Sequence, residues 1–244
     1  MIRFIAFALM LLLAVVARPV LAQSEEEESF RNELSYGVNL NSNGGLIGGV
    51  FVRSAYTIND DVLQFGALEI VEVKHPRELR VYGQTGDSFI IGKQSYLFVV
   101  RPQYGRELVL FRKAAESGVQ VNAIGAIGPS LGFLAPYYIQ YNYGMSGFED
   151  IRTERYDPVK HVNKEFILGS AGVFTGLGES ELNIGVHGKA GLSFEYGRYN
   201  ESIAGVEVGV LVEAFTKKMV IIPEAQNNSV FTSVYLNIYY GRRK

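Results

Sequence analysis

The chain has 244 residues, no cysteine and a formal net charge of −2. That length suits one barrel or sandwich domain, or two smaller domains. The near balance of charge argues against nucleic acid as a partner, because a nucleic-acid binder needs a clustered basic footprint. The missing cysteines exclude disulfides, thiol catalysis and cysteine-ligated metal sites within this chain.

The first 22 residues have the pattern of a secretory signal peptide. Arg3 supplies a positive start, and an uncharged apolar run follows from Phe4 to Val16. Val20-Leu21-Ala22 then offers a cleavage site after Ala22. A membrane anchor is the alternative, but a spanning helix needs roughly 20 apolar residues. We therefore predict a signal peptide over residues 1–22.

The next segment, residues 23–32, is acidic. It contains four consecutive glutamates, Glu25 to Glu28. Like charges at this density repel one another and stay solvated. The pattern predicts a flexible tail, followed by one domain over residues 33–244.

Beyond the tail, apolar residues recur with a period of two, which indicates β-strands with two unlike faces. In the segment 33–42 the apolar set is Leu34, Tyr36, Val38 and Leu40, and the residues between them are small or polar. The segment 183–196 repeats the pattern, with Ile184, Val186, Leu192 and Phe194 on one face and His187, Lys189, Ser193 and Glu195 on the other.

Soluble lipocalin-like barrels and sandwiches also alternate. The clearest segments here, however, run 10 to 14 residues, whereas soluble strands usually have about 5–6 residues and tilted membrane strands about 9–11. The glycine-rich polar face also suits the interior of a narrow barrel. We therefore predict an all-β fold: a closed, antiparallel, up-and-down transmembrane β-barrel.

Ten strands fit the pattern best, with eight as the alternative because the region 107–141 is the least regular. The expected strands are 33–42, 45–57, 62–74, 95–105, 107–113, 118–127, 131–141, 181–196, 202–215 and 229–241. Turns are expected at Gly105-Arg106 and at Gly128 to Ser130. The three long connections, 74–93, 142–180 and 217–228, then fall on one side of the sheet, as in outer-membrane barrels. A short helix is possible within 159–178.

Tyrosines gather near the ends of the expected strands. They can form the aromatic girdle found at membrane interfaces, or they can reflect the ordinary β-propensity of tyrosine. The positions are Tyr56, Tyr96, Tyr104, Tyr137, Tyr138, Tyr196, Tyr239 and Tyr240.

The sequence contains no catalytic, phosphate-binding or metal-binding motif, and its three histidines lack metal-ligand spacing. No cofactor and no metal are expected. His187 is a weak catalytic candidate, because it shares the predicted interior face with Ser193 and Glu195. Ser193 would lie about 20 Å away along the same strand, so a structural role is favoured. A hairpin turn near Tyr199 would instead bring His187 beside Glu213.

Charged residues on the interior faces of two adjacent strands predict a cluster in the lumen, formed by His187, Lys189, Glu207 and Glu213. Buried charges of this kind need to be paired. A second candidate is the start of the first long loop, with Lys74, His75, Arg77 and Glu78. This charged stretch is either a recognition element or a plain solvated loop.

Several stretches resemble an uncharacterised family of outer-membrane β-barrel proteins from Bacteroidota. They are Leu68 to Glu78, Phe89 to Gln94, Gly128 to Tyr138 and the ending Tyr240 to Lys244. The resemblance spans most of the predicted domain and implies location and architecture, but no activity. Better-known outer-membrane barrels commonly end in an aromatic residue that assists the insertion machinery, whereas here a basic tail follows Tyr240.

The predicted function is a barrel of the bacterial outer membrane with a structural or surface-interaction role and no evident catalysis. The expected partners are outer-membrane lipid, the barrel insertion machinery and an unidentified extracellular ligand. Three alternatives stay open at this point: a narrow pore, an outer-membrane hydrolase acting on lipid, and a soluble periplasmic ligand-binding barrel.

Overall fold

The computed structural model describes residues 32–83, 85–112, 118–144, 149–196 and 202–243. The predicted signal peptide, residues 1–22, lies outside them, as does the predicted acidic tail except for its last residue, Asn32. Among the residues described, no helix has the length and apolar character needed to cross a membrane.

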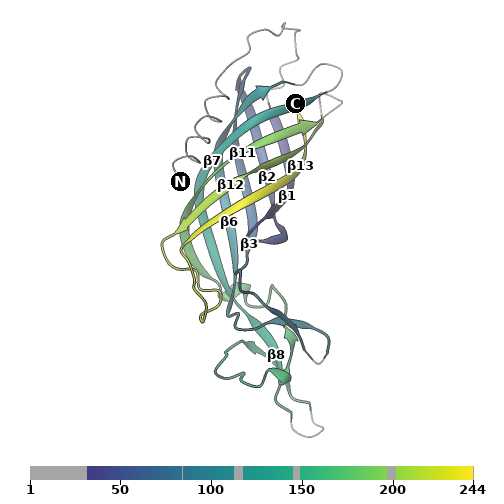
Figure 1. Ribbon diagram of the computed structural model, residues 1–244, viewed down its shortest axis with the longest axis vertical. Helices are drawn as coiled ribbons and strands as arrows, with labels where there is room; N and C mark the ends of the chain where they lie inside the picture. The colour runs from purple at the N-terminus through teal and green to yellow at the C-terminus, as the bar shows by residue number, and fades with distance from the viewer. Residues whose placement is uncertain (1–31, 84, 113–117, 145–148, 197–201, 244) are drawn as a thin grey trace, which may run out of the picture.

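Eight long strands of the described chain form a closed antiparallel barrel (Figure 1). Each strand pairs with its nearest barrel neighbours along the chain, and pairing of the first with the last closes the wall, in the order β1-β13-β12-β11-β7-β6-β3-β2. Closure leaves no open sheet edge, which lipid would not tolerate. The strands are β1 (Asn32–Asn41), β2 (Gly45–Asn59), β3 (Val62–Val73), β6 (Ser95–Phe111), β7 (Val119–Pro136), β11 (Glu181–Tyr196), β12 (Ser202–Phe215) and β13 (Val230–Arg243).

The predicted barrel class is confirmed, but the favoured count of ten strands is wrong and the alternative of eight is right. Two expected turns lie inside continuous strands. Gly105 falls within β6, where a Cβ atom would stand 2.4 Å from the ring of Phe65. Here glycine makes room for an interior ring and does not mark a turn.

The second expected turn, at Gly128 to Ser130, lies within β7. Val100 pairs with Leu131 and Tyr104 with Ile127, so the constant register sets Pro102 opposite Pro129. Proline has no backbone N–H to donate to a ladder. Because the two prolines face each other, the hydrogen bonds that they cannot donate are missing at a single place in the β6–β7 ladder. The pairing resumes in the same register beyond that place, so both strands continue.

The two ends of the barrel differ. The long connections 74–94, 137–180 and 216–229 all leave one end, which we call the long-loop end, as the sequence predicted. Asn32 and Arg243 mark the opposite, short-turn end, where only residues 60 and 61 link β2 to β3.

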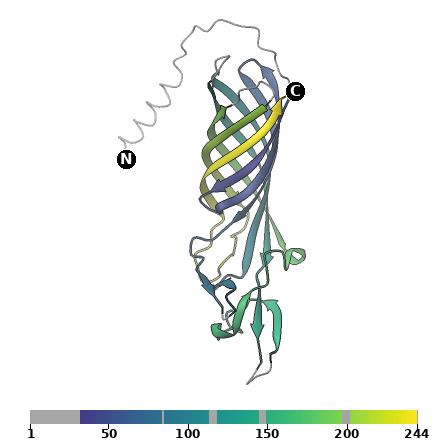
Figure 2. The same cartoon turned by 90° about the vertical axis from the view of Figure 1, so that its right-hand side faces the viewer.

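The connections 74–94 and 137–180 form an extension beyond the long-loop end (Figures 1 and 2). Its core contains Tyr96 of β6 and Ala135 of β7 together with Tyr137, Ile139 and Ile167. The helix considered within 159–178 takes the form of two short 3-10 turns. The elements are β4 (Arg80–Tyr82) paired with β5 (Ser88–Ile90), the sheet β10-β8-β9 with β8 (Tyr138–Asn142), β9 (Ile151–Arg155) and β10 (Ile167–Ser170), and the 3-10 turns η1 (Lys164–Phe166) and η2 (Leu177–Glu179).

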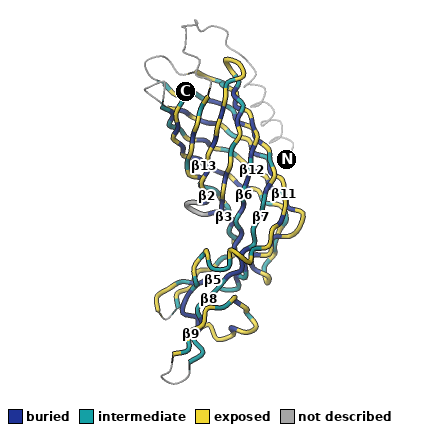
Figure 3. Tube along the Cα trace, turned by 180° about the vertical axis from the view of Figure 1, so that it is seen from behind, coloured by how far each residue is buried: buried dark blue, intermediate teal, exposed yellow. Residues whose placement is uncertain are grey.

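Buried and exposed residues alternate along the barrel strands (Figure 3). The apolar side chains point outward: Ile184, Val186 and Leu192 are all exposed. A lipocalin-like barrel would hold these side chains inside, so the structure contradicts that alternative. The exposed apolar belt includes Leu34, Val38, Val50, Val52, Leu68, Ile70, Ile127, Ile184, Val186, Leu192, Val206, Val208, Val210, Val212, Val234 and Ile238.

The tyrosines divide by position. Tyr56, Tyr104, Tyr196 and Tyr240 are exposed on the barrel exterior toward the short-turn end, which fits an interfacial girdle. The others differ: Tyr96 and Tyr137 are buried in the core of the extension, Tyr138 is half-buried on β8, and Tyr239 is buried inside the barrel.

An apolar cluster closes the barrel interior at the long-loop end. Val71, Leu97 and Val99 from the wall pack against Met219 and Ile221 from the connection between β12 and β13. The backbone N–H of Gln94 donates to the carbonyl of Ile221, which fastens this connection to the loop before β6. The interior is therefore capped by side chains on the side that carries the extension.

Candidate functional site

The interior of the barrel is filled by ion pairs and hydrogen bonds that link opposite walls. One group surrounds Glu207 of β12, which is fully buried. It contacts the guanidinium of Arg53 from β2, accepts a hydrogen bond of 3.1 Å from Lys189 Nζ and another of 2.8 Å from the hydroxyl of Tyr235. Arg53 also lies 3.8 Å from Glu107 of β6. This group joins five strands across the lumen: β2, β6, β11, β12 and β13.

A second group surrounds Arg101 of β6, nearer the long-loop end. Its guanidinium donates two hydrogen bonds of 2.8 Å to the carboxylate of Glu213 and a third of 3.2 Å to Glu69. Gln103 donates to the other oxygen of Glu69 at 2.6 Å, and Ser130 donates to Glu213 at 2.5 Å. Bidentate arginine–carboxylate pairs of this kind are strong and geometrically specific.

The four predicted lumen residues, His187, Lys189, Glu207 and Glu213, are all buried. His187 pairs with Glu213 across the β11–β12 ladder, which is the register expected from a turn near Tyr199. Lys189 reaches Glu207 directly.

Sequence reasoning missed the arginines that hold these carboxylates. Arg53 is buried and follows the exposed Val52. Arg101 is likewise buried between two less buried neighbours, Val100 and Pro102. The parity rule used for β11 would therefore have placed both arginines in the lumen.

The environment of His187 does not form a catalytic triad. The residue that contacts it is Ser130 of β7, whose Oγ lies 3.0 Å from His187 Nδ1; the predicted partner Ser193 instead donates to Glu107 at 3.1 Å. In a triad the histidine bridges the serine and the acid. Here Ser130 bridges His187 and Glu213, and Arg101 occupies that carboxylate. Ser130 and Glu213 are also fully buried, so a substrate has no access.

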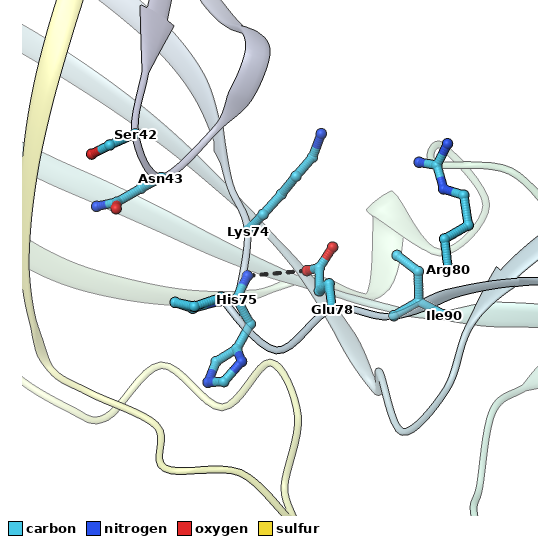
Figure 4. A pocket seen from close by; sticks show the side chains of 8 residues that line it. Ser42, Asn43, Lys74, His75, Glu78, Arg80 and Ile90 are labelled. Atoms are coloured by element: carbon cyan, nitrogen blue, oxygen red, sulfur yellow. Dashed lines mark hydrogen bonds between the residues drawn. The ribbon is translucent and has the colours of Figure 1, made fainter.

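Three of the four residues predicted as a surface-loop site line a pocket of about 340 Å³ at the long-loop end (Figure 4). Lys74, His75 and Glu78 line it; Arg77 is exposed and is not among the lining residues. The wall is completed by Ser42, Asn43, Pro76, Arg80 and Ile90. The pocket thus lies between the β1–β2 turn and the root of the extension, and Arg80 is a lining cation that the sequence analysis did not single out.

Hydrogen bonds fix the shape of this pocket. The backbone N–H of His75 donates to Glu78 at 3.1 Å, and Lys93 Nζ donates to the same carboxylate at 2.8 Å. Lys93 is almost wholly buried. Burial lowers the pKa of Lys93, and the neighbouring Glu78 opposes that shift. Lys93 thus neutralises Glu78, and Lys74 Nζ lies 3.6 Å from a carboxylate oxygen of Glu72. Arg80 is exposed and adds a further positive charge to the lining.

A third polar cluster lies on the extension. Glu154 of β9 accepts a hydrogen bond of 2.9 Å from His161 Nε2 and also contacts Lys160 and the hydroxyl of Tyr143. Burial alone raises the pKa of Glu154, but the hydrogen bonds from His161, Lys160 and Tyr143 outweigh burial and hold the pKa at about 2.

This shift predicts an acid-sensitive extension. A carboxylate whose pKa is lowered by folding stabilises the fold above its unfolded pKa, here 4.5, and that stabilisation is lost as the pH falls toward about 2. We expect pepsin to cleave the Glu154→Gln variant progressively faster than the wild-type extension as the pH rises from about 2 toward 4.5, because only the wild type gains the stabilisation from an ionised Glu154. Equal cleavage of the two proteins across this range would contradict the prediction.

Within the described residues, no group of histidine and carboxylate side chains has the arrangement needed to hold a metal ion.

An apolar exterior, a wall without edges and an interior of paired charges together define the transmembrane β-barrel fold class. No protein-family model matches this chain, and no curated protein matches it.

Solved structures with a similar course of the chain include two bacterial proteins. One is Ail, the attachment invasion locus protein of Yersinia pestis, in complex with the heparin analogue sucrose octasulfate, with 10% identity over 88% of this chain and 97% of that chain and a TM-score of 0.39. The other is Neisserial surface protein A, with 11% identity over 90% of this chain and 98% of that chain and a TM-score of 0.38. The barrel assignment rests on the strand pairing of this chain itself.

Proposed function

We propose that this chain is a bacterial outer-membrane protein whose barrel is a membrane anchor without an open pore, and whose extension makes a surface interaction. The observation that carries the proposal is the reversal of the two faces: aliphatic rows face outward, while arginines and glutamates face inward. Soluble monomers rarely expose large contiguous apolar patches. Lipid is the solvent that makes this arrangement favourable.

The ends of the barrel favour one orientation. In barrels of the outer membrane, short turns face the periplasm and longer loops face outward. The extension leaves the long-loop end, and both ends of the described barrel chain lie at the other. The extension would then stand outside the cell.

The packing of the interior favours an anchor over a pore. Five fully buried polar residues come from four strands: Ser130, Ser193, Glu207, Glu213 and Asn237. Eight-stranded barrels are generally just wide enough to be filled by side chains. The apolar cluster at the long-loop end adds a second closure.

The pocket beside the extension suits an acidic group on an extracellular ligand. The exposed Arg80 supplies positive charge there, Lys74 adds an ammonium group that also lies 3.6 Å from Glu72, and Ser42 and Asn43 supply polar side chains. We place the surface interaction at this pocket and on the neighbouring face of the extension.

The chain has no cysteine, so single-cysteine variants can test the orientation. Val162→Cys places a thiol on the extension, and Asp60→Cys places one at the β2–β3 turn. With a membrane-impermeant maleimide we expect intact cells to label Val162→Cys, and Asp60→Cys to be labelled only after the outer membrane is permeabilised. The reverse pattern, or recovery of the protein in the periplasm without detergent, would reject the proposal.

The same purified variants test the anchor against the pore. We expect heat-modifiable migration on a gel, because a closed barrel stays folded in detergent until heated. We also expect no steady conductance in planar bilayers. A stable single-channel conductance would overturn the anchor and support the pore.

A further inference from the structure

The turn formed by residues 171–180, which we call the rim turn, displays two large apolar side chains. Phe174 is 81% exposed and Leu177 is 39% exposed. From this turn we infer that the protein has a second lipid contact: the rim turn inserts Phe174 and Leu177 into the interfacial layer of the outer leaflet, beside the barrel wall. The inference rests on the proposed function, since it needs a barrel embedded in lipid.

The rim turn is firmly held. Ala171 N–H donates to the carbonyl of Tyr138 at 2.9 Å, and the hydroxyl of Thr175 donates to the carbonyl of Ala171 at 2.7 Å. The hydroxyl of Tyr138 donates to the carboxylate of Glu179 at 3.0 Å. Gly176 has a positive φ of 93°, which favours glycine, and lies against the ring of Tyr138. The exposure of Phe174 therefore belongs to a fixed turn.

Two adjacent apolar residues of the rim turn have opposite surroundings. Val173 packs against the core of the extension, while the adjacent Phe174 points away from it. Because the turn is held in place, Phe174 cannot be buried within this chain by a small movement. An apolar surface outside the chain is needed to cover it.

The rim turn is continuous with the apolar belt. The hydroxyl of Ser180 donates to the carbonyl of Leu177 at 2.7 Å, and β11 begins at the next residue, Glu181. Leu182 and Ile184 of β11 are exposed on the barrel exterior. Figure 2 shows the turn with η2 standing out sideways from β7, just past the barrel wall. This continuity favours lipid over a protein as the surface that covers Phe174.

Another exposed apolar position provides a matched comparison. Val159 is 83% exposed but belongs to a loop farther out on the extension. Its neighbour Lys160 lies 5.5 Å from the ring of Tyr143, which follows the outer end of β8. Val159 should therefore stay in water while Phe174 meets lipid.

The chain has no tryptophan, so each substitution creates a single fluorescent reporter. We compare Phe174→Trp, the belt variant Ile184→Trp and the distal variant Val159→Trp in phosphatidylcholine vesicles with and without brominated acyl chains. We expect Phe174→Trp to have blue-shifted emission and to lose fluorescence in brominated vesicles nearly as strongly as Ile184→Trp. Val159→Trp should emit like tryptophan in water and lose little.

The outcomes separate the two proposals. If Ile184→Trp is quenched and Phe174→Trp behaves like Val159→Trp, the barrel is in lipid and the rim-turn contact is wrong; this result would follow if a protein partner normally covers Phe174. If Ile184→Trp is not quenched, the membrane proposal itself fails. Should Phe174→Trp not fold, Phe174→Cys with a nitroxide label gives the same decision, because collision with oxygen marks lipid and collision with a water-soluble nickel chelate marks water.

Discussion

Replacing Arg101 by methionine is expected to lower the free energy of unfolding by about 3–5 kcal/mol, the usual result of removing one partner from a buried ion pair. Arg101 is the cation that contacts both Glu69 and Glu213. Without it, the contacts that the structure shows for these carboxylates come from the neutral side chains of Gln103 and Ser130. Urea titration of the refolded protein in lipid vesicles, followed by the gel shift of the folded barrel, measures the change.

Two comparisons make this result specific. Lys217→Met removes an exposed partner of Glu181, 3.4 Å away, and should cost no more than about 1 kcal/mol. The triple variant Arg101→Met, Glu69→Gln and Glu213→Gln should recover much of the loss, because it leaves no unpaired charge in the lumen. A loss for Arg101→Met as small as that for Lys217→Met would show that the interior is hydrated.

Placing a charge on the apolar belt is expected to have the next largest effect. Val210 lies on β12, is 51% exposed and stands opposite Ala190 and Val234 on the neighbouring strands. Val210→Arg should destabilise the protein in vesicles by about 2–4 kcal/mol, as measured by urea titration, because arginine on the lipid face near the bilayer centre is costly.

The matched control is Val159→Arg, on the exposed loop of the extension. Since that side chain meets water, its substitution should change the stability by no more than about 0.5 kcal/mol. If Val210→Arg were as harmless as Val159→Arg, the aliphatic rows would not face lipid, and the membrane proposal would lose its main support.

The two faces of the strands could be predicted from the sequence because alternation follows from backbone geometry alone. Once Ile184 and Val186 are assigned to one side of a strand, His187 and Lys189 must point to the other. Which side faces outward required the further argument from strand length and from the small polar residues. The side of the long loops followed from the same counting and is also seen in the structure.

The strand count could not be read in the same way. Gly105 and Pro129 are common turn residues, and their local sequences do resemble turns. Their roles depend on the neighbouring strands: Phe65 fills the space that Gly105 leaves, and Pro102 faces Pro129 across the ladder. These contacts exist only after the strands have paired.

The candidate site shows a similar division. Parity placed His187, Lys189, Glu207 and Glu213 in the lumen, but it could not show that Arg101 reaches Glu213 from another part of the wall, because closure of the barrel sets that distance. The pocket could not be predicted from parity, because its lining comes from separate segments of the chain. It brings Ser42, on the β1–β2 turn, to the same place as Arg80 and Ile90, and nothing in the local sequence indicates that meeting.

Because β6 and β7 contribute residues to the core of the extension and also form part of the barrel wall, a ligand that pulls on the extension loads those strands along their length. Hydrogen bonds between antiparallel strands run perpendicular to the strands. Many bonds would therefore share the strain in shear, instead of breaking one after another. Under the proposed function, tension from a surface bound by the extension would pass along β6 and β7 into the barrel wall without first unfolding a hinge.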